Sequence, residues 1–177
     1  MELLESLVFI DESGAKTNMT RLYGRAKKGR RCYDDAPHGH WNTTTMVSSI
    51  RLDGSTACMT LDGAQTTEAY REYVRQILVP PLRTGYLVIF DNLAAHHDPK
   101  ALEIIHSAGA MTLALPAYSP DLNPIEKMWS KVKAFLRKAK ARTWDALEKA
   151  IKDALDTISA SDALGWFVSC RYGNSQD

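Results

Sequence analysis

Two short, uninterrupted runs of apolar residues along this chain each end at an aspartate. Residues 7–10 are followed by Asp11, and residues 87–90 are followed by Asp91. A continuous rather than alternating run is typical of a strand buried on both faces. Open α/β sheets bind ligands at the carboxyl ends of such strands, so the two carboxylates are expected to meet if the strands are neighbours. Like charges this close favour a shared proton or a cation, whereas a single aspartate here would simply cap a turn.

The rest of the pattern predicts a mixed α/β domain. Further strands are predicted where apolar or β-branched residues run without helical spacing, over residues 43–50, 56–61 and 111–115. Helices are predicted where apolar residues recur every three or four positions, over residues 66–78, 99–107, 124–140 and 144–158. Turns are expected at Ser13-Gly14 and Asp53-Gly54. No linker or repeat interrupts the pattern, so residues 1–177 are interpreted as one domain.

The helix predicted from residue 124 carries a third acid in its first turn. Asn123 is a good N-cap, Pro124 suits the first helical position, and Glu126 is the third residue of the helix. This arrangement resembles a capping box, in which the glutamate bonds back to the backbone at the N-cap. On spacing alone, Glu126 could therefore either cap the helix or join the two aspartates.

Charge is segregated along the chain, although its net value is only +1. Six basic residues and no acid lie between residues 21 and 31, and seven more lie between residues 127 and 142, again without an acid. The rest of the chain carries nine basic against 21 acidic residues. Either stretch alone would fit a solvated surface, but the two together favour binding to a nucleic-acid backbone. The candidate phosphate contacts are Arg21, Arg25, Lys27, Lys28, Arg30, Arg31, Lys127, Lys131 and Lys138.

Composition sets broad limits on class and compartment. A chain of 177 residues that is 45% apolar can bury one core. No apolar stretch approaches the roughly 20 residues that span a bilayer, and the N-terminus has no signal-peptide pattern. The three cysteines are odd in number and widely spaced, which fits free thiols better than a disulfide framework. We therefore expect a cytoplasmic protein with no membrane partner.

Three strings around the acids resemble the motifs of one family. One string resembles the closing motif of IS630/Tc1/mariner transposases, namely Pro116-x-Tyr118-Ser119-Pro120-x-Leu122-Asn123-Pro124-Ile125-Glu126-x-x-Trp129-x-x-x-Lys133. Another string resembles the first motif of that family, namely Phe9-Ile10-Asp11-Glu12-Ser13. The third string resembles the second motif, namely Asp91-Asn92-Leu93-Ala94-Ala95-His96. The 34 residues between Asp91 and Glu126 match the spacing of the IS630 branch.

The resemblance implies an α/β, RNase H-like fold, with a mixed five-stranded sheet flanked by helices. The first and fourth strands are neighbours in that fold, which would bring Asp11 beside Asp91. These two aspartates and Glu126 would be the catalytic residues and would hold two Mg²⁺ ions, for which Mn²⁺ is expected to substitute. The implied chemistry is DNA cleavage and strand transfer, in which water and then a freed 3′-hydroxyl attack a phosphodiester.

Neighbours of the three acids are expected to support them. Asn92 and His96 match the second motif and could orient Asp91 or contact the scissile strand, although His96 and His97 fit a surface pair equally well. Asn123 is expected to act beside Glu126 at the start of the helix. Strand alternation places Glu12 on the face opposite Asp11, in a structural or supporting role.

The resemblance also implies partners. DNA is expected, both as transposon ends and as target, and a dimer is expected in the DNA complex. Family members carry an N-terminal helix-turn-helix region, for which this chain has no room before its first strand. Either a separate or frameshift-fused polypeptide is therefore expected to supply that region, or the chain is a truncated form of a longer protein.

Two other functions stay open. A phosphohydrolase of the haloacid-dehalogenase type also places an aspartate after an apolar strand, but it needs a second aspartate where this chain has Ser13. A catalytically inactive remnant that still binds nucleic acid is the other alternative, and the three intact acids argue against it.

Overall fold

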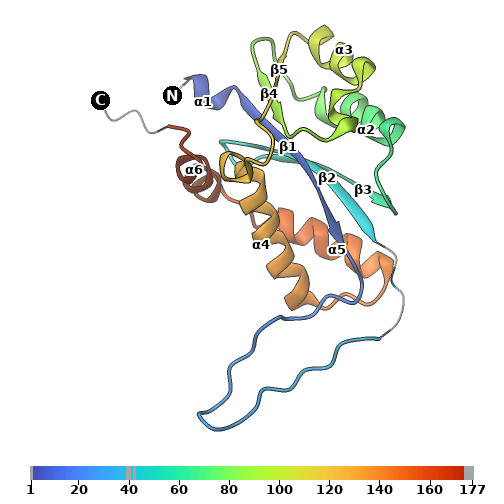
Figure 1. Cartoon of the computed structure of the whole chain (residues 1–177), viewed down its shortest axis with the longest axis vertical. Helices are drawn as coiled ribbons and strands as arrows, with labels where there is room; N and C mark the ends of the chain where they lie inside the picture. Colours follow the sequence, from blue (N-terminus) through green and yellow to red (C-terminus); the bar gives the residue numbers. More distant parts are fainter. Residues whose placement is uncertain (1, 39–40, 42, 174–177) are drawn as a thin grey trace.

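The computed structural model describes residues 2–38, 41 and 43–173. Its centre is a mixed five-stranded sheet in the order β3-β2-β1-β4-β5 (Figure 1). The strands are β1 (Leu7–Ala15), β2 (Thr44–Arg51), β3 (Thr56–Asp62), β4 (Leu87–Phe90) and β5 (Met111–Ala114). The first three are antiparallel, while β4 is parallel to β1 and β5 is parallel to β4. The predicted mixed five-stranded sheet is confirmed.

Helices cover both faces of the sheet. The α-helices are α1 (Glu2–Glu5), α2 (Thr67–Tyr73), α3 (Pro99–Ser107), α4 (Pro124–Ala139), α5 (Trp144–Leu155) and α6 (Ala160–Ser169). Short helical turns add η1 (Val74–Leu78), η2 (Ala94–His97) and η3 (Pro120–Leu122). Helices α1 and α6 were not predicted, although Ser159 and Asp162 form a capping box that begins α6.

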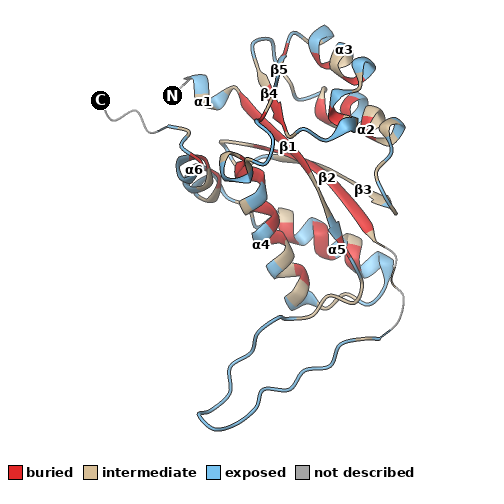
Figure 2. Cartoon of the chain, viewed as in Figure 1, coloured by how far each residue is buried: buried red, intermediate tan, exposed pale blue. Residues whose placement is uncertain are grey.

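Alternation along β1 divides the core into two layers. Phe9 packs with Trp129 and other buried side chains of α4, α5 and α6. Ile10 points to the opposite face and packs with Tyr70 and other buried side chains of α2, η1 and α3. Figure 2 shows the buried residues along β1 and on the inner sides of these helices. Side chains at odd and even positions of β1 therefore reach different layers, which decides where Asp11 and Glu12 lie.

The first strand is longer than the sequence predicted. The expected turn at Ser13-Gly14 is wrong, because β1 pairs with β2 as far as the Ala15–Thr44 pair. The long β-branched strand β2 gives β1 a partner along its whole length, and Gly14 pairs with Thr45 within that ladder. Asp11 therefore lies inside a strand, whereas Asp91 directly follows β4 as predicted. The other predicted turn, at Asp53-Gly54, joins β2 to β3.

The connection from β1 to β2 extends away from the sheet (Figure 1). Residues 21–36 of this connection are all exposed. Its first part is tied to the domain by Arg142, which donates hydrogen bonds to the carbonyl oxygens of Thr17 and Met19 at 2.9 Å each. Farther along, Lys140 pairs with Asp34. None of the helices in the described part of the chain has the length and apolar character to cross a membrane.

Candidate active site

The two aspartates predicted to meet lie level on adjacent strands. The parallel register pairs Leu7 with Leu87 and Phe9 with Ile89, and its continuation places Asp11 opposite Asp91. The surroundings of the two side chains differ strongly. Asp11 is 6% exposed, whereas the side chain of Asp91 is 48% exposed.

Asp11 is a buried carboxyl among other acids. Burial is the main reason why its pKa rises from 3.8 to about 7. A hydrogen bond from the Glu12 backbone N–H, 2.8 Å from Oδ1, partly offsets this rise, while the charges of Glu126, Asp91 and Glu12 add to it. The carboxyl of Asp11 therefore has acidic neighbours, and among the described residues no basic side chain forms a hydrogen bond with it.

Asp91 is held from two sides through one oxygen. Its Oδ1 lies 2.7 Å from Nδ1 of His96 and accepts a hydrogen bond from the backbone N–H of Leu93 at 3.0 Å. These contacts, chiefly the one with His96, lower the pKa of Asp91 below its usual value. Asp91 is therefore ionised at pH values at which Asp11 is still protonated.

The histidine that holds Asp91 is completely buried. His96 is 0% exposed, so the alternative of a surface histidine pair is wrong for this residue, while His97 is exposed. Its second ring nitrogen, Nε2, lies 3.0 Å from Oε2 of Glu12. Burial alone would lower the pKa of His96, but the hydrogen bonds to Asp91 and Glu12 outweigh it and raise the pKa to about 9. A buried imidazolium between two carboxylates follows from this arrangement.

Glu126 lies in the first turn of α4 and is exposed. The capping-box alternative is wrong, because the N-cap residue Asn123 makes no side-chain cap hydrogen bond. Asn123 is instead 4% exposed, and its Oδ1 has no hydrogen-bond partner in the described part of the chain. The local geometry therefore leaves the carboxylate of Glu126 free of a helix-capping task.

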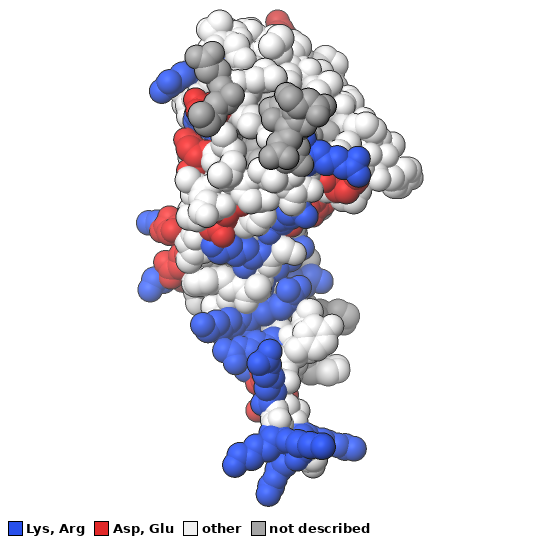
Figure 3. All heavy atoms as spheres, turned by 90° about the vertical axis from the view of Figure 1, so that its left-hand side faces the viewer, with Lys and Arg blue, Asp and Glu red and all other residues white. Residues whose placement is uncertain are grey.

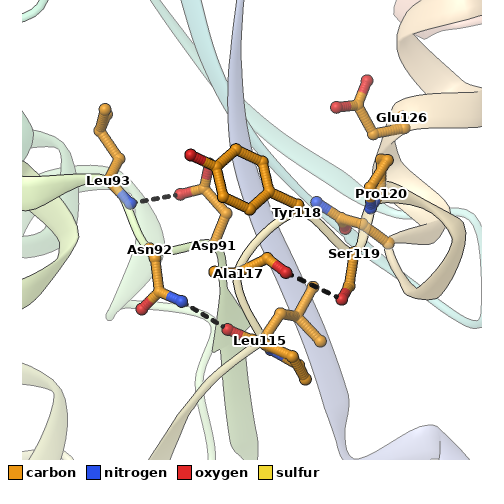
Figure 4. A pocket seen from close by; sticks show the side chains of 11 residues that line it. Asp91, Asn92, Leu93, Leu115, Ala117, Tyr118, Ser119, Pro120 and Glu126 are labelled. Carbon is orange, nitrogen blue, oxygen red and sulfur yellow. Dashed lines mark hydrogen bonds between the residues drawn. The ribbon is translucent and has the colours of Figure 1, made fainter.

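Asp91 and Glu126 share a cavity of about 440 Å³. Its wall includes Asn92, Asn123 and Tyr118, and Figure 4 shows the Tyr118 ring projecting between the two acids. Tyr118 is fully exposed and has a φ of 57°, in the left-handed region that a non-glycine residue rarely adopts. Among the described residues, no three acidic, histidine or cysteine side chains converge closely enough to hold a metal ion.

A family model described as DDE superfamily endonuclease matches residues 6–148, which is most of the chain and contains all three acids. The chain belongs to the DDE superfamily endonuclease family. This finding confirms a DDE-type endonuclease domain, as the resemblance to the transposase motifs implied. No curated protein matches the chain.

The fold of this DDE domain is similar to that of transposase and integrase structures. The fold is similar to Mos1 transposase in a paired-end complex with the left transposon end, with a TM-score of 0.73 and 14% identity over 94% of this chain and 52% of that one. The catalytic domain of Mos1 mariner transposase gives 0.60 and 14% over 94% and 78%. The catalytic core domain of BIV integrase gives 0.56 and 15% over 85% and 81%. The predicted RNase H-like fold is confirmed, and the chain spans about half the length of the full Mos1 transposase chain.

Other predicted site residues of the DDE domain take varied positions. The side chain of Asn92 makes no hydrogen bond to Asp91 but donates one to the Leu115 carbonyl oxygen at 2.9 Å, which ties the end of β4 to the end of β5. The ammonium group of Lys131 binds Asp162 at 2.7 Å and the Thr157 carbonyl oxygen at 2.9 Å, so it links α4 to α6. The basic residues 21–31 are all exposed, Lys138 is exposed, and Lys127 is partly so.

Two features of the site were missed from the sequence. The sequence suggested that His96 could orient Asp91, but the contact between Glu12 and His96 depends on the burial of His96, which no local pattern indicates. The position of Tyr118 over the cavity depends on a left-handed backbone in an irregular loop. Its place in the closing motif was the available signal.

Proposed function

We propose that this chain is the catalytic domain of a transposase of the IS630/Tc1/mariner type, which cleaves and joins DNA strands. The observation that carries the proposal is the level placement of a buried Asp11 and a clamped Asp91 beside a cavity that Glu126 also lines. Family membership supports a nuclease, and the absence of a capping role for Glu126 supports its use as the third acid. Because the described residues fold around one sheet, we propose residues 1–177 as a single catalytic domain.

The donor set fits a divalent cation. Three carboxylates supply the oxygen ligands that Mg²⁺ and Mn²⁺ prefer, and Asp11 has its pKa raised partly by the other two. Two similar Mos1 structures are described as paired-end complexes with Mn and with Mg. We expect two Mg²⁺ ions here, which when bound would supply Lewis-acid activation of a phosphodiester.

The residues of the chain have distinct tasks in this proposal. Asp11 must lose its proton before it can bind a cation, and its pKa of about 7 allows this near neutral pH. Asp91 enters already ionised and held by His96 and the Leu93 N–H. Glu126 is exposed in a helix turn, so its side chain can swing toward the aspartates past Tyr118. Tyr118 offers a ring on which a base beside the scissile phosphate can stack.

DNA is the proposed substrate, as both transposon end and target. Figure 3 shows Lys and Arg side chains over the lower half of one side of the molecule and at its tip. The exposed basic residues 21–31, which we call the basic segment, fit phosphate contacts. A helix-turn-helix region on another polypeptide and a dimer in the DNA complex complete the proposal.

Plasmid nicking tests the proposed chemistry. The purified chain is expected to nick supercoiled DNA with Mg²⁺ or Mn²⁺ and not with chelator. Asp91→Asn and Glu126→Gln are expected to lower the rate by roughly a hundredfold or more, because each removes a metal-ligating carboxylate. Glu103→Gln, an exposed change on α3, is the control and should match the parent. Equal nicking by all four proteins, or none by the parent, would contradict the proposal.

Salt dependence tests the basic segment. The parent is expected to bind short duplexes weakly, without sequence preference, and less tightly as salt increases. The double variant Lys27→Gln and Lys28→Gln is expected to reduce the slope of log K against log salt by about 1–2, because each lost phosphate contact releases one counterion fewer. Fluorescence anisotropy over a salt series measures this slope. The matched change of Lys149 and Lys152 on α5 should leave it unaltered, and equal slopes for both variants would contradict the assignment.

A further inference from the structure

A continuous polar connection passes from one layer of the core to the candidate active site. It begins at Glu12, whose side chain leaves β1 on the face opposite Asp11. Oε2 of Glu12 lies 3.0 Å from Nε2 of His96, and Nδ1 of His96 lies 2.7 Å from Oδ1 of Asp91. The connection thus joins two acids at the same histidine, one from within β1 and the other from the residue that follows β4.

The histidine in the middle has little freedom to move. It is completely buried, and its ring lies 4.8 Å from the Tyr70 ring and 5.8 Å from the Phe90 ring, measured between centroids. A buried imidazole needs partners for its ring nitrogens, and a backbone carbonyl oxygen would satisfy it. Here both nitrogens form hydrogen bonds with carboxylates instead, and one of them, that of Asp91, lines the cavity.

We propose that Glu12 is a positioning residue that acts through His96 to fix the carboxylate of Asp91, and this rests on the function proposed above. Oδ1 of Asp91 takes both of the contacts found for this side chain among the described residues. These two contacts fix the orientation of a carboxylate whose side chain is half exposed, and they leave its other oxygen, Oδ2, free to bind a metal ion. Outer partners of this kind orient the ligands of metal sites.

The reach of Glu12, not its charge, carries the effect. A shorter carboxylate at position 12 keeps the charge but cannot span the 3.0 Å contact to His96 without a backbone shift. A glutamine keeps the length, and its amide can donate to or accept from Nε2, so His96 can still donate to Asp91. The hydrogen bond from Gln65 Nε2 to Glu12 Oε2, at 3.3 Å, supports the side chain from the other side.

The test compares Glu12→Asp with Glu12→Gln. The affinity of the protein alone for Mn²⁺, followed by electron paramagnetic resonance of free Mn²⁺, is expected to fall about tenfold or more in Glu12→Asp. Glu12→Gln is expected to recover most of that loss. The Mn²⁺ concentration that gives half-maximal nicking should move in parallel. His106→Gln, which alters an exposed histidine bonded to Thr112, is the control and should match the parent.

The outcomes separate the two proposals. Parent-like Mn²⁺ affinity in a folded Glu12→Asp, or a loss in Glu12→Gln as large as in Glu12→Asp, overturns the positioning role and leaves the proposed function standing. A merely structural role would lower the melting temperature of Glu12→Asp without altering the Mn²⁺ affinity of the folded protein. A parent that neither binds Mn²⁺ nor nicks DNA overturns both proposals. His96→Gln gives a second reading, since it breaks the same connection at its centre.

Discussion

Asp11 and Asp91 stand opposite one another on neighbouring strands, yet their surroundings act in opposite directions. Asp11 is buried inside β1, and burial raises its pKa to about 7. Asp91 follows the end of β4, is half exposed, and has its pKa lowered by His96 and the Leu93 N–H. The difference arises from strand length, because β1 continues beside β2 for four residues past Asp11 whereas β4 stops at Phe90.

This contrast shows how a sheet can hold two close acids before any cation arrives. One carboxyl can take a proton while the other stays ionised, so the pair avoids two full charges side by side. Pairs whose pKa values are pushed apart by their environments are typical of functional sites. This arrangement fits the proposed cation, which would replace the proton of Asp11.

The largest expected effect comes from removing the charge of Asp11. The pKa of Asp11 is raised in the folded state, so the stability that it contributes is complete below pH 3.8 and is lost as the pH rises through about 7. Asp11→Asn mimics the neutral acid and escapes this loss. The unfolding free energy of the variant is compared with that of the parent at each pH, without metal. Between pH 4 and pH 8 this difference should shift in favour of the variant by on the order of 4 kcal/mol. Chemical denaturation in chelator across this range measures the gain.

Asp91→Asn is the matched control, because its pH dependence has the opposite sign. The pKa of Asp91 is lowered in the folded state, so its contribution is present above its ordinary pKa and is lost in acid. Asp91→Asn should therefore be less stable than the parent at neutral pH, with a smaller deficit at low pH. If the difference between Asp11→Asn and the parent stays constant from pH 4 to pH 8, the contrast between the two acids is wrong.

Local patterns predicted the frame of this contrast but not its cause. The two apolar runs and the Asp53-Gly54 turn are encoded over a few residues, and the periodicity of α4 is visible within four turns. The extension of β1 depends on pairing with β2, about 30 residues farther along the chain. The burial of His96 likewise depends on Tyr70 from α2, which only the folded chain brings near. Long-range packing therefore decided the electrostatics that sequence spacing left open.

The smallest effect sharpens the contrast at the Asp91 end. The Leu93 N–H donates to Asp91, and Leu93 has a φ of −64°, which proline adopts without strain. Leu93→Pro removes this donor alone and should raise the pKa of Asp91 toward its ordinary value. Because Asp91 is half exposed, the expected loss at pH 7 relative to pH 3 is only about 0.5–1 kcal/mol of unfolding free energy.

Leu93→Ala keeps the N–H and is the reference for this change. Proline also restricts the unfolded chain, but that entropic gain is the same at both pH values, so the pH 7 to pH 3 difference isolates the hydrogen bond. Denaturation of both variants at the two pH values measures it, with a titration of the Asp91 carboxyl by nuclear magnetic resonance as a direct check. Identical pH dependence in the two variants would mean that the neighbouring histidines keep Asp91 ionised without the Leu93 N–H, and that the backbone at the end of β4 adds nothing to the difference between the two aspartates.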